Sequence, residues 1–371
     1  MKRDSTTEVF FALLRSGLWE QEVSLAPYEP VNLDAVYQLA EEQSVIGLVA
    51  AAFDHIDRKV ETLKVRPFLV WVIAQEQRNK AMNDFVNWLI ARLREEAVEA
   101  VIVKGQGLAH CYARPKWRAC GDIDLFLTPE NYEKARVVLL PISSSSGKEI
   151  IYEKHLDMLI GGFAVEIHGT MNTSVSDRID ITQSAIQERM FREKRFRTWQ
   201  NGGVDVLLPE PDDDVIFVFV HIVKHFYKGG IGMRQICDWC RLLWTYKDTF
   251  DRELLLVRLK RMDIMDEWKG LAALAVDYLG IPSDAMPFYD ASAKWSSKAR
   301  KILRIVLQKG NFGHKEDRSY YQKRSYIAIK VISLWRWIKD YFKLFAIFPQ
   351  NSWRSFWKIV KGGIVVAAKG E

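Results

Sequence analysis

The chain has 371 residues, of which 49% are hydrophobic and 27% charged, and it carries a formal net charge of +6. This composition excludes a disordered, collagen-like or disulfide-rich protein, and the length is sufficient for two or three domains. Four cysteines do not form a secreted disulfide framework, and the charged, amphipathic N-terminus lacks a signal-peptide pattern. We therefore expect a cytoplasmic protein with reduced cysteines.

The positive charge is concentrated in one region of the sequence. From Ser319 onward there are ten Lys or Arg and two acidic residues, a net of +8, which leaves −2 for the rest of the chain. No run of eighteen or more apolar residues occurs, so the sequence predicts no membrane-spanning helix.

Helical periodicity dominates the first quarter of the chain. Apolar residues recur every three or four positions between residues 6 and 97, and residues 67–98 indicate one long helix with Pro67 near its start. Short apolar and β-branched runs then predict strands, and Thr128 followed by Pro129 predicts the start of a helix. The expected order is a strand at 99–103, a helix from 105, a strand at 121–127, a helix from 129, a loop at 141–148, and strands at 149–160 and 163–171 joined by Gly161-Gly162.

After Asp177 the sequence becomes helical again. A small hairpin, expected to end at Pro209 and Pro211, interrupts this region. Further helices are expected at 212–227, 232–246, 253–279 and 292–309.

This order predicts an α+β fold, in which a small mixed β-sheet core lies between N-terminal and C-terminal helical regions. The predicted divisions are an N-terminal helical region at 1–97, a core at 98–175, a helical domain that completes the cleft at 176–290, and a basic, Trp-rich helical region at 291–371.

Two acidic residues lie inside the apolar run GDIDLFL. Residues two apart in a strand point to the same face, so Asp122 and Asp124 project side by side, whereas Ile123 and Leu125 point into a core. Adjacent carboxylates repel each other unless a cation lies between them, and Mg²⁺ prefers carboxylate oxygens. The pair predicts a metal site, although a lone Asp-x-Asp also occurs at solvated strand ends.

A third acid follows in the run FAVEIHGTM. Glu166 and His168 face the side opposite to Val165 and Ile167, so Glu166 joins the two aspartates if the two strands are neighbours. Three carboxylates on adjacent strands can hold two metal ions about 3.5–4 Å apart around an in-line phosphoryl displacement. The alternative for Glu166 is a surface acid on an edge strand, and for His168 we favour a supporting role over a catalytic one.

Lys104-Gly105 lies where the first strand meets the first helix of the core. Glycine lets the backbone approach a phosphate, and a helix N-terminus favours negative charge. Lys104 is therefore a candidate for neutralising a phosphate, with Gln106 and Gly107 extending the turn.

The run VKGQGLAHCYARPKWRACGDIDLFL, followed by VEIH, resembles the DNA polymerase β-type nucleotidyltransferase superfamily. More narrowly, it is similar to the bacterial family of uncharacterised nucleotidyltransferases, with the pattern Lys-Gly, Tyr, Arg, Gly-Asp-x-Asp and then Glu-x-His. HIVKHFY and GMRQICDW are similar to the helical half of that family. The resemblance extends from the N-terminal helices to about Leu279, and no motif that we recognise covers the remainder.

The resemblance implies a mixed-sheet catalytic fold and Mg²⁺-dependent transfer of a nucleoside monophosphate from an NTP, with release of pyrophosphate. It implies two Mg²⁺ ions, with Mn²⁺ as the alternative, and an NTP as donor. The wider superfamily carries Gly-Gly or Gly-Ser at the phosphate-side turn, where this chain has Lys-Gly-Gln-Gly. The matching residues are Asp122 and Asp124 as metal ligands, Glu166 as the third carboxylate that activates the acceptor hydroxyl, Lys104, Gly105 and Gln106 at the turn, and Arg118 ahead of the aspartates.

The helical half supplies further candidates. His221, Lys224, His225 and Lys228 share one helical face by their spacing, either as a solvated basic face or as a face that meets phosphate or acceptor. Two further pairs have a structural interpretation. Arg234 and Asp238, four apart, are expected to pair, with contact of Arg234 with the site as the alternative. Cys237 and Cys240 are expected to lie in the core because a zinc site needs a second ligand pair.

The C-terminal region has three interpretations. An apolar stripe runs through Ile327, Val331, Leu334, Ile338, Phe342 and Phe345 at helical spacing, and Trp353, Trp357 and several lysines follow. Such a stripe usually packs on the protein, but Trp, Phe and Lys/Arg also favour an interfacial membrane helix, here at the inner face of the membrane, and a basic aromatic surface is compatible with nucleic acid. We rank packing first, membrane contact second and nucleic acid third.

The sequence thus predicts an enzyme, a metal-dependent nucleotidyltransferase that uses a hydroxyl acceptor of unspecified identity. The rival hypothesis is a nucleotide-binding or scaffold module without catalysis, possessing the same fold. Mg²⁺ and NTP would bind in both cases, whereas only the enzyme releases pyrophosphate once the acceptor is supplied.

Overall fold

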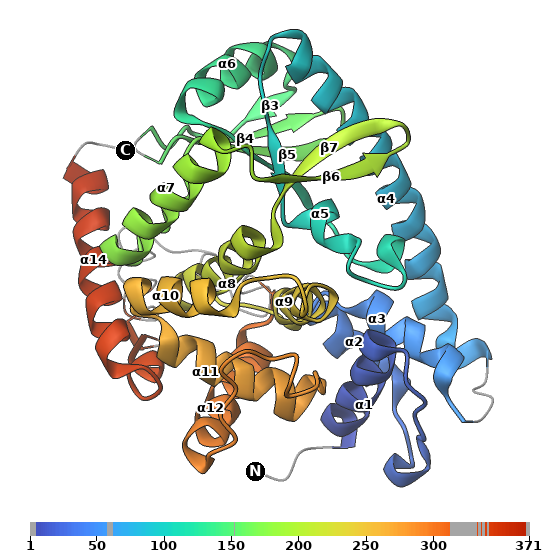
Figure 1. The fold of residues 1–371 in the computed structure, drawn as a ribbon. Coiled ribbons are helices and arrows are strands. Elements are labelled where there is room, and N and C mark those ends of the chain that lie inside the picture. Colours follow the sequence, from blue (N-terminus) through green and yellow to red (C-terminus); the bar gives the residue numbers. More distant parts are fainter. Residues whose placement is uncertain are drawn as a thin grey trace.

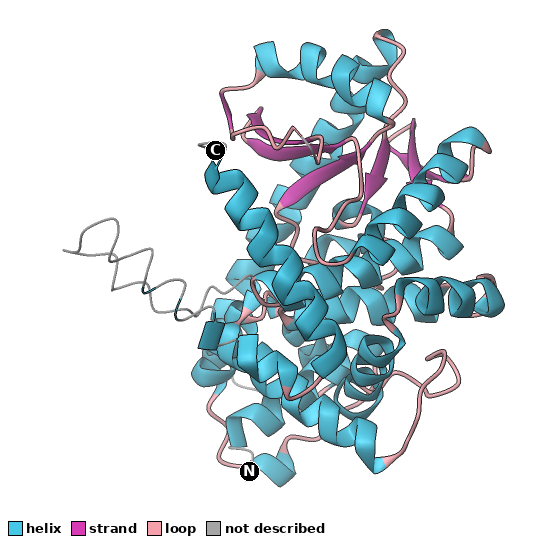
Figure 2. Ribbon diagram, turned by 90° about the vertical axis from the view of Figure 1, so that its left-hand side faces the viewer, coloured by secondary structure: helices cyan, strands magenta, loops and turns pink. Residues whose placement is uncertain are grey.

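The computed structural model describes residues 5–57, 62–151, 153–311, 332, 335, 338–339 and 341–368. A seven-stranded mixed sheet lies at one end of the molecule. Helices that precede and follow the sheet in the sequence form the rest of the molecule (Figures 1 and 2). The expected α+β class with helical regions on both sides of a mixed sheet is therefore confirmed.

The N-terminal region is helical, as expected, and one helix connects it to the sheet. The helix α4 has 34 residues and is therefore about 51 Å long at 1.5 Å per residue. Phe68 near its start belongs to the helical core, whereas Val86 and Leu89 belong to the core beneath the sheet. The helices of this region are α1 (Ser5–Trp19), α2 (Leu33–Glu42), α3 (Ile46–Ala51) and α4 (Thr62–Glu95).

The sheet has the order β3-β4-β5-β2-β1-β7-β6. The predicted succession of strand, helix, strand, helix and hairpin is confirmed, while the expected loop at 141–148 contains the two-residue strand β3. The predicted small hairpin forms β6 and β7 and joins the same sheet, because β7 pairs in parallel with β1. The elements are β1 (Val101–Val103), α5 (Gly105–Ala109), β2 (Asp122–Phe126), α6 (Pro129–Leu139), β3 (Ser145–Ser146), β4 (His155–Ile160), β5 (Phe163–His168), β6 (Phe196–Asn201) and β7 (Val204–Pro209).

The strand register brings the acidic residues together. Strands β2 and β5 are parallel neighbours with Asp124 opposite Glu166, so the expected adjacency is confirmed. The turn Gly161-Gly162 has φ values of +58° and +81°, which favour glycine, and it joins β4 to β5. This turn also fixes the antiparallel register that places His155 opposite His168.

The two faces of the sheet differ in chemistry. Ile123, Leu125, Val165 and Ile167 share one core with residues of α4 and α6, as the alternation predicts. The side chain of Thr128 caps α6 by accepting a hydrogen bond from the backbone N–H of Asn131. The alternate residues of β2 and β5 therefore face the opposite side, where the C-terminal helices lie.

Helices α7 to α12 build that opposite side. Glu210, the residue before α8, makes no side-chain hydrogen bond that caps this helix. Instead, Asp213 pairs with Arg258 of α10 and Asp214 pairs with Arg197 of β6, which holds α8 against the sheet. The bounds are α7 (Asp177–Arg192), α8 (Pro211–Lys228), α9 (Met233–Thr245), α10 (Arg252–Met262), α11 (Met265–Leu274) and α12 (Ala293–Lys309).

The last helix, α14 (Pro349–Ala368), lies along α7 (Figure 1). Lys358 Nζ is 2.7 Å from Asp177 Oδ1 and 2.6 Å from Asp180 Oδ2, which agrees with the packing interpretation. Trp353 and Trp357 remain 57% and 45% exposed. The predicted stripe lies outside the described residues from Ile327 to Leu334, and among described helices none has the length and apolar character needed to cross a membrane.

Glu267 connects α14 to the helical core, and we expect its carboxyl group to make the free energy of unfolding depend on pH. Its carboxyl accepts hydrogen bonds from Tyr227 Oη at 2.6 Å and from Asn351 Nδ2 at 3.0 Å, and burial raises its pKa to about 7. Between pH 4.5 and about 7, the native carboxyl holds a proton that the unfolded state releases, so stability falls as pH rises.

In Glu267→Gln we expect no such fall of stability with rising pH, because the amide stays neutral. The free energies of unfolding of variant and wild type should be similar near pH 4.5 and differ by about 3 kcal/mol in favour of the variant by pH 8. Urea unfolding across this pH range measures the difference. Parallel pH profiles would contradict the assigned role of Glu267.

Candidate active site

A cavity of about 420 Å³ lies between the polar face of the sheet and helices α8 and α9. Its size is in the range of small-ligand sites. It is lined by all but one of the predicted site residues: Lys104, Gly105, Arg118, Asp122, Asp124, Glu166, His221, Lys224 and His225. The remaining one, Gln106, is buried and donates a hydrogen bond to Asn79 of α4 at 3.2 Å.

The three predicted carboxylates converge in this cavity. One oxygen from each of Asp122, Asp124 and Glu166 lies within 4.8 Å of the others, so the group can hold a metal ion. Asp124 is only 2% exposed. Hard divalent cations such as Mg²⁺ take oxygen ligands of this type, so the donor set fits the metal that the sequence implies.

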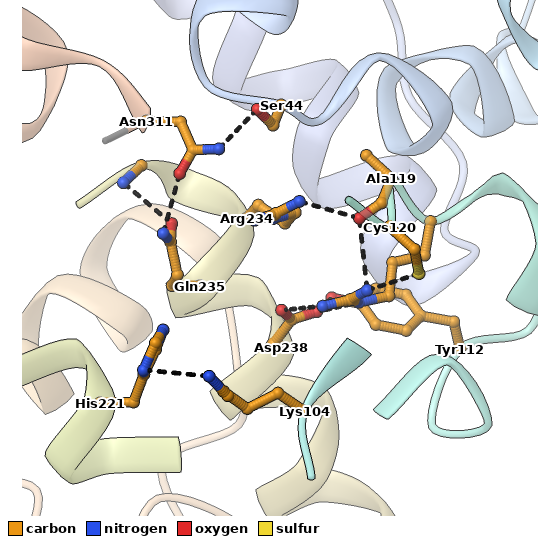
Figure 3. A network of polar contacts seen from close by, with 12 residues as sticks. Ser44, Lys104, Tyr112, Ala119, Cys120, His221, Arg234, Gln235, Asp238 and Asn311 are labelled. Carbon is orange, nitrogen blue, oxygen red and sulfur yellow. Dashed lines mark hydrogen bonds and ion pairs between the residues drawn. The ribbon is translucent and has the colours of Figure 1, made fainter. Parts of the chain in front are cut away.

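Lys104 reaches the same carboxylates from the end of β1. Its Nζ lies 2.7 Å from Asp124 Oδ1. It also lies 3.5 Å from His221 Nδ1 (Figure 3). Its φ of +57° and the φ of +39° at Gly105 turn the chain sharply into α5. A Cβ at Gly107 would lie 2.9 Å from Leu208 Cδ2, so glycine also lets α5 pack closely against β7.

Two histidines flank Glu166. His168 Nε2 lies 2.9 Å from Asp124 Oδ1 and 3.5 Å from Glu166 Oε2, and its expected supporting role stays a prediction. Its ring stacks on His155 with centroids 4.6 Å apart. His155 Nε2 is in turn 2.8 Å from Asp157 Oδ1 and 3.5 Å from Glu166 Oε2.

His155 and Asp157 were not predicted as site residues from the sequence, although a signal was present. The two-residue Gly161-Gly162 turn sets Ile160 opposite Phe163, and counting back along β4 places both residues beside the acidic group.

Charge interactions divide the acids into two kinds. Repulsion by Asp124, followed by burial, raises the pKa of Asp122. Burial acts against ionisation of Asp124 and Glu166, yet Lys104 and His168 hold the pKa of Asp124 below its usual value, and His155 and His168 lower the pKa of Glu166 further. Asp122 is therefore the carboxylate that most lacks a cation.

The basic face of α8 points partly into the cavity. His221, Lys224 and His225 line it, whereas Lys228 is not among the lining residues. Burial and then the positive charge of Lys104 lower the pKa of His221 strongly and that of His225 to about 3. Both imidazoles are therefore neutral at neutral pH, and the cationic member of this lining group is Lys224.

Arg118 is held in place by a buried acid. Its Nε and Nη2 donate to the two oxygens of Asp238 at 2.7 and 2.6 Å, and Tyr112 Oη donates to Asp238 Oδ1 at 2.7 Å. The expected pairing of Asp238 with Arg234 is wrong, because Arg234 Nη1 instead donates to the Ala119 carbonyl at 3.0 Å (Figure 3). Both arginines thus position the loop before β2.

The loop before β2 is also held from the opposite side. Asn79 of α4 accepts the hydrogen bond of Gln106 and donates to the carbonyls of Lys116 and Arg118, both at 2.8 Å. The side chain of Gln106 therefore supports the wall of the cavity from behind.

The cysteines lie in the core, as predicted for Cys237 and Cys240. All four are buried and none forms a disulfide. Burial raises the pKa of Cys240 and strongly raises that of Cys237, so neither is poised as a thiolate.

A mixed sheet presents three carboxylates on adjacent strands to a partly basic helix, and this group of carboxylates could hold a metal ion. A family model described as uncharacterised nucleotidyltransferase matches residues 29–280, more than half of the chain, and the chain belongs to this family. Comparisons with curated proteins and with solved structures give no significant match.

Proposed function

We propose that this protein transfers a nucleoside monophosphate from an NTP to a hydroxyl acceptor in a reaction that needs Mg²⁺ or Mn²⁺. The observation that carries the proposal is the convergence of Asp122, Asp124 and Glu166 in one cavity with Lys104 and Lys224. Family membership supports an NTP as the donor. The sequence resemblance implies two ions.

The reaction is an in-line displacement at the α-phosphorus. The acceptor oxygen forms a bond to this phosphorus, the bond to the β-phosphate bridging oxygen breaks, and pyrophosphate leaves with the electron pair. Asp122, Asp124 and Glu166 would hold a divalent cation, which would neutralise charge on the transferring phosphoryl group. Glu166 accepts the hydroxyl proton, the role that the sequence resemblance implies for the third carboxylate.

The surrounding residues have positioning roles in this proposal. Lys104 and Lys224 supply positive charge to the phosphates, and Arg118 keeps the loop before β2 in place through Asp238. The neutral rings of His221 and His225 offer hydrogen bonds without further charge. The acceptor class stays open between a small molecule, a glycan precursor, a protein side chain and an RNA end.

Glu166→Gln should separate chemistry from donor binding. We expect kcat to fall about 10²- to 10⁴-fold, because the amide cannot accept the hydroxyl proton, while the KM for the NTP changes little. Steady-state kinetics of pyrophosphate release measure both constants. His155→Gln is the matched control, since it removes a neighbour of Glu166 and leaves the carboxylate; equal losses in both variants would remove Glu166 from the role of base.

The rival hypothesis of a non-catalytic nucleotide-binding or scaffold module is tested by the same product. Such a module would bind Mg²⁺ and NTP without releasing pyrophosphate. We favour the enzyme because all three carboxylates and a half-buried lysine converge on one cavity, an arrangement that nucleotide binding alone does not need.

Membrane and nucleic-acid contacts of the C-terminal region stay sequence predictions. Two of the basic residues that suggested them have intramolecular partners: Arg354 pairs with Asp263, and Lys358 pairs with Asp177 and Asp180. These charges support packing of α14 on the protein.

A further inference from the structure

Lys104 adopts a backbone conformation that disfavours any side chain. Its φ of +57° and ψ of −145° lie in a region that glycine populates and L-residues rarely do. A glycine would relieve this strain, yet the chain has a lysine at this position. Strain held at a functional site indicates that the side chain itself has a task there.

The strained backbone directs the ammonium group of Lys104 to the acidic cluster. Nζ is 2.7 Å from Asp124 Oδ1 and 3.5 Å from His221 Nδ1, and the side chain is 19% exposed. The same oxygen of Asp124 lies 2.9 Å from His168 Nε2. Asp124 Oδ1 is therefore already surrounded by two nitrogen groups of the chain.

We propose that the Lys104 ammonium takes the place of a second metal ion, so that Asp122, Asp124 and Glu166 hold one divalent cation. This inference rests on the proposed function and replaces the two ions that the sequence resemblance implies. One divalent ion and one ammonium together balance the charge of three carboxylates. A second divalent ion would meet the repulsion of an ammonium 2.7 Å from one of its ligands.

Neighbouring groups support a charged lysine at this position. Lys104 Nζ lies 2.7 Å from Asp124 Oδ1, and Asp122 and Glu166 line the same cavity as this lysine. An ammonium has three N–H donors, and Asp124 and His221 face two of them. Because Lys104 lines the cavity, the third is available to an oxygen of the transferring phosphate.

Counting bound Mn²⁺ tests the proposal without using catalysis. Full-length protein is equilibrated with Mn²⁺ alone, bound metal is quantified, and electron paramagnetic resonance detects the magnetic coupling that two ions about 3.5–4 Å apart would show. Two variants remove the ammonium: Lys104→Met keeps the length of the side chain, and Lys104→Gly also relieves the backbone. Lys224→Met is the matched control, because it removes a cation that lines the same cavity from α8.

We expect one uncoupled Mn²⁺ in the wild type and in Lys224→Met, and two coupled ions in Lys104→Met and Lys104→Gly. Two coupled ions in the wild type would overturn the inference and leave the proposed function standing. One ion in all four proteins would also overturn it, because Lys104 would then not be what excludes the second ion. The absence of Mn²⁺ binding in the wild type would instead contradict the metal site of the proposed function.

Discussion

Asp122→Asn and Asp124→Asn should each reduce nucleotidyl transfer by about a thousandfold or more. A divalent ion at a transferring phosphoryl group contributes several kcal/mol, and each 1.36 kcal/mol is a factor of ten in rate. Both residues offer a ligand oxygen to the same cation position. The loss should appear in transfer of label from an α-labelled NTP and in Mn²⁺ binding.

The two substitutions should have opposite effects on stability. Asp124 raises the pKa of Asp122 by repulsion, so Asp122→Asn removes an unfavourable charge and should leave the melting temperature unchanged or higher. Asp124→Asn removes the buried partner of Lys104 and should lower it. Asp157→Asn is the control, since Asp157 is 59% exposed at the cavity edge; a comparable loss of transfer there would argue against a specific role for the aspartate pair.

The second large effect is expected at the buried pair behind the site. Arg118→Ala leaves the Asp238 carboxylate buried without the guanidinium that donates to both of its oxygens. Removing one partner of a buried ion pair costs about 3–5 kcal/mol, so the free energy of unfolding should fall by that amount. Urea unfolding at neutral pH measures it.

A double variant separates the cost of an unpaired charge from lost packing. The variant Arg118→Met/Asp238→Asn has no charge at the position of this buried pair. The Asn oxygen can still accept the hydrogen bond from Tyr112. We expect the double variant to be more stable than Arg118→Ala, because replacing both partners of a buried pair is far less costly than replacing one. Strictly additive losses would show that Arg118 and Asp238 do not act as a pair.

The acidic group could be predicted from the sequence because a strand has a side-chain period of two. Asp122 and Asp124 therefore point to the same face of their strand, and Glu166 points to the face opposite to that of Ile167. The three carboxylates come together because β2 and β5 pair with each other, so one strand pairing is sufficient to form the group. His155 was predictable by the same logic, through the register that the Gly161-Gly162 turn imposes.

The support of the site could not be predicted in this way. Arg118 and Asp238 are 120 positions apart, and their contact depends on how α9 docks on the loop before β2. The local rule for residues four apart favoured a pair of Asp238 with Arg234, but the buried, bidentate contact with Arg118 is stronger than an ordinary pair along one helix.

The conformation of Lys104 was likewise not evident from the sequence. A Lys-Gly pair at a strand end indicated phosphate binding, whereas the positive φ that directs the ammonium to Asp124 results from the junction of β1 with α5. The residue type identified Lys104 as a candidate, whereas the backbone geometry determines that its ammonium contacts Asp124.

The central claim is transfer of a nucleoside monophosphate, and the position of the label in the donor tests it most directly. Protein, Mg²⁺ and cell extract are incubated in parallel with NTPs labelled at the α- or the γ-phosphate, with Asp122→Asn and Asp124→Asn as controls. The account predicts that α-label moves to an acceptor, that γ-label appears only in pyrophosphate, and that both variants abolish the transfer. Transfer of γ-label to the acceptor, or α-label transfer that survives in both variants, would contradict it.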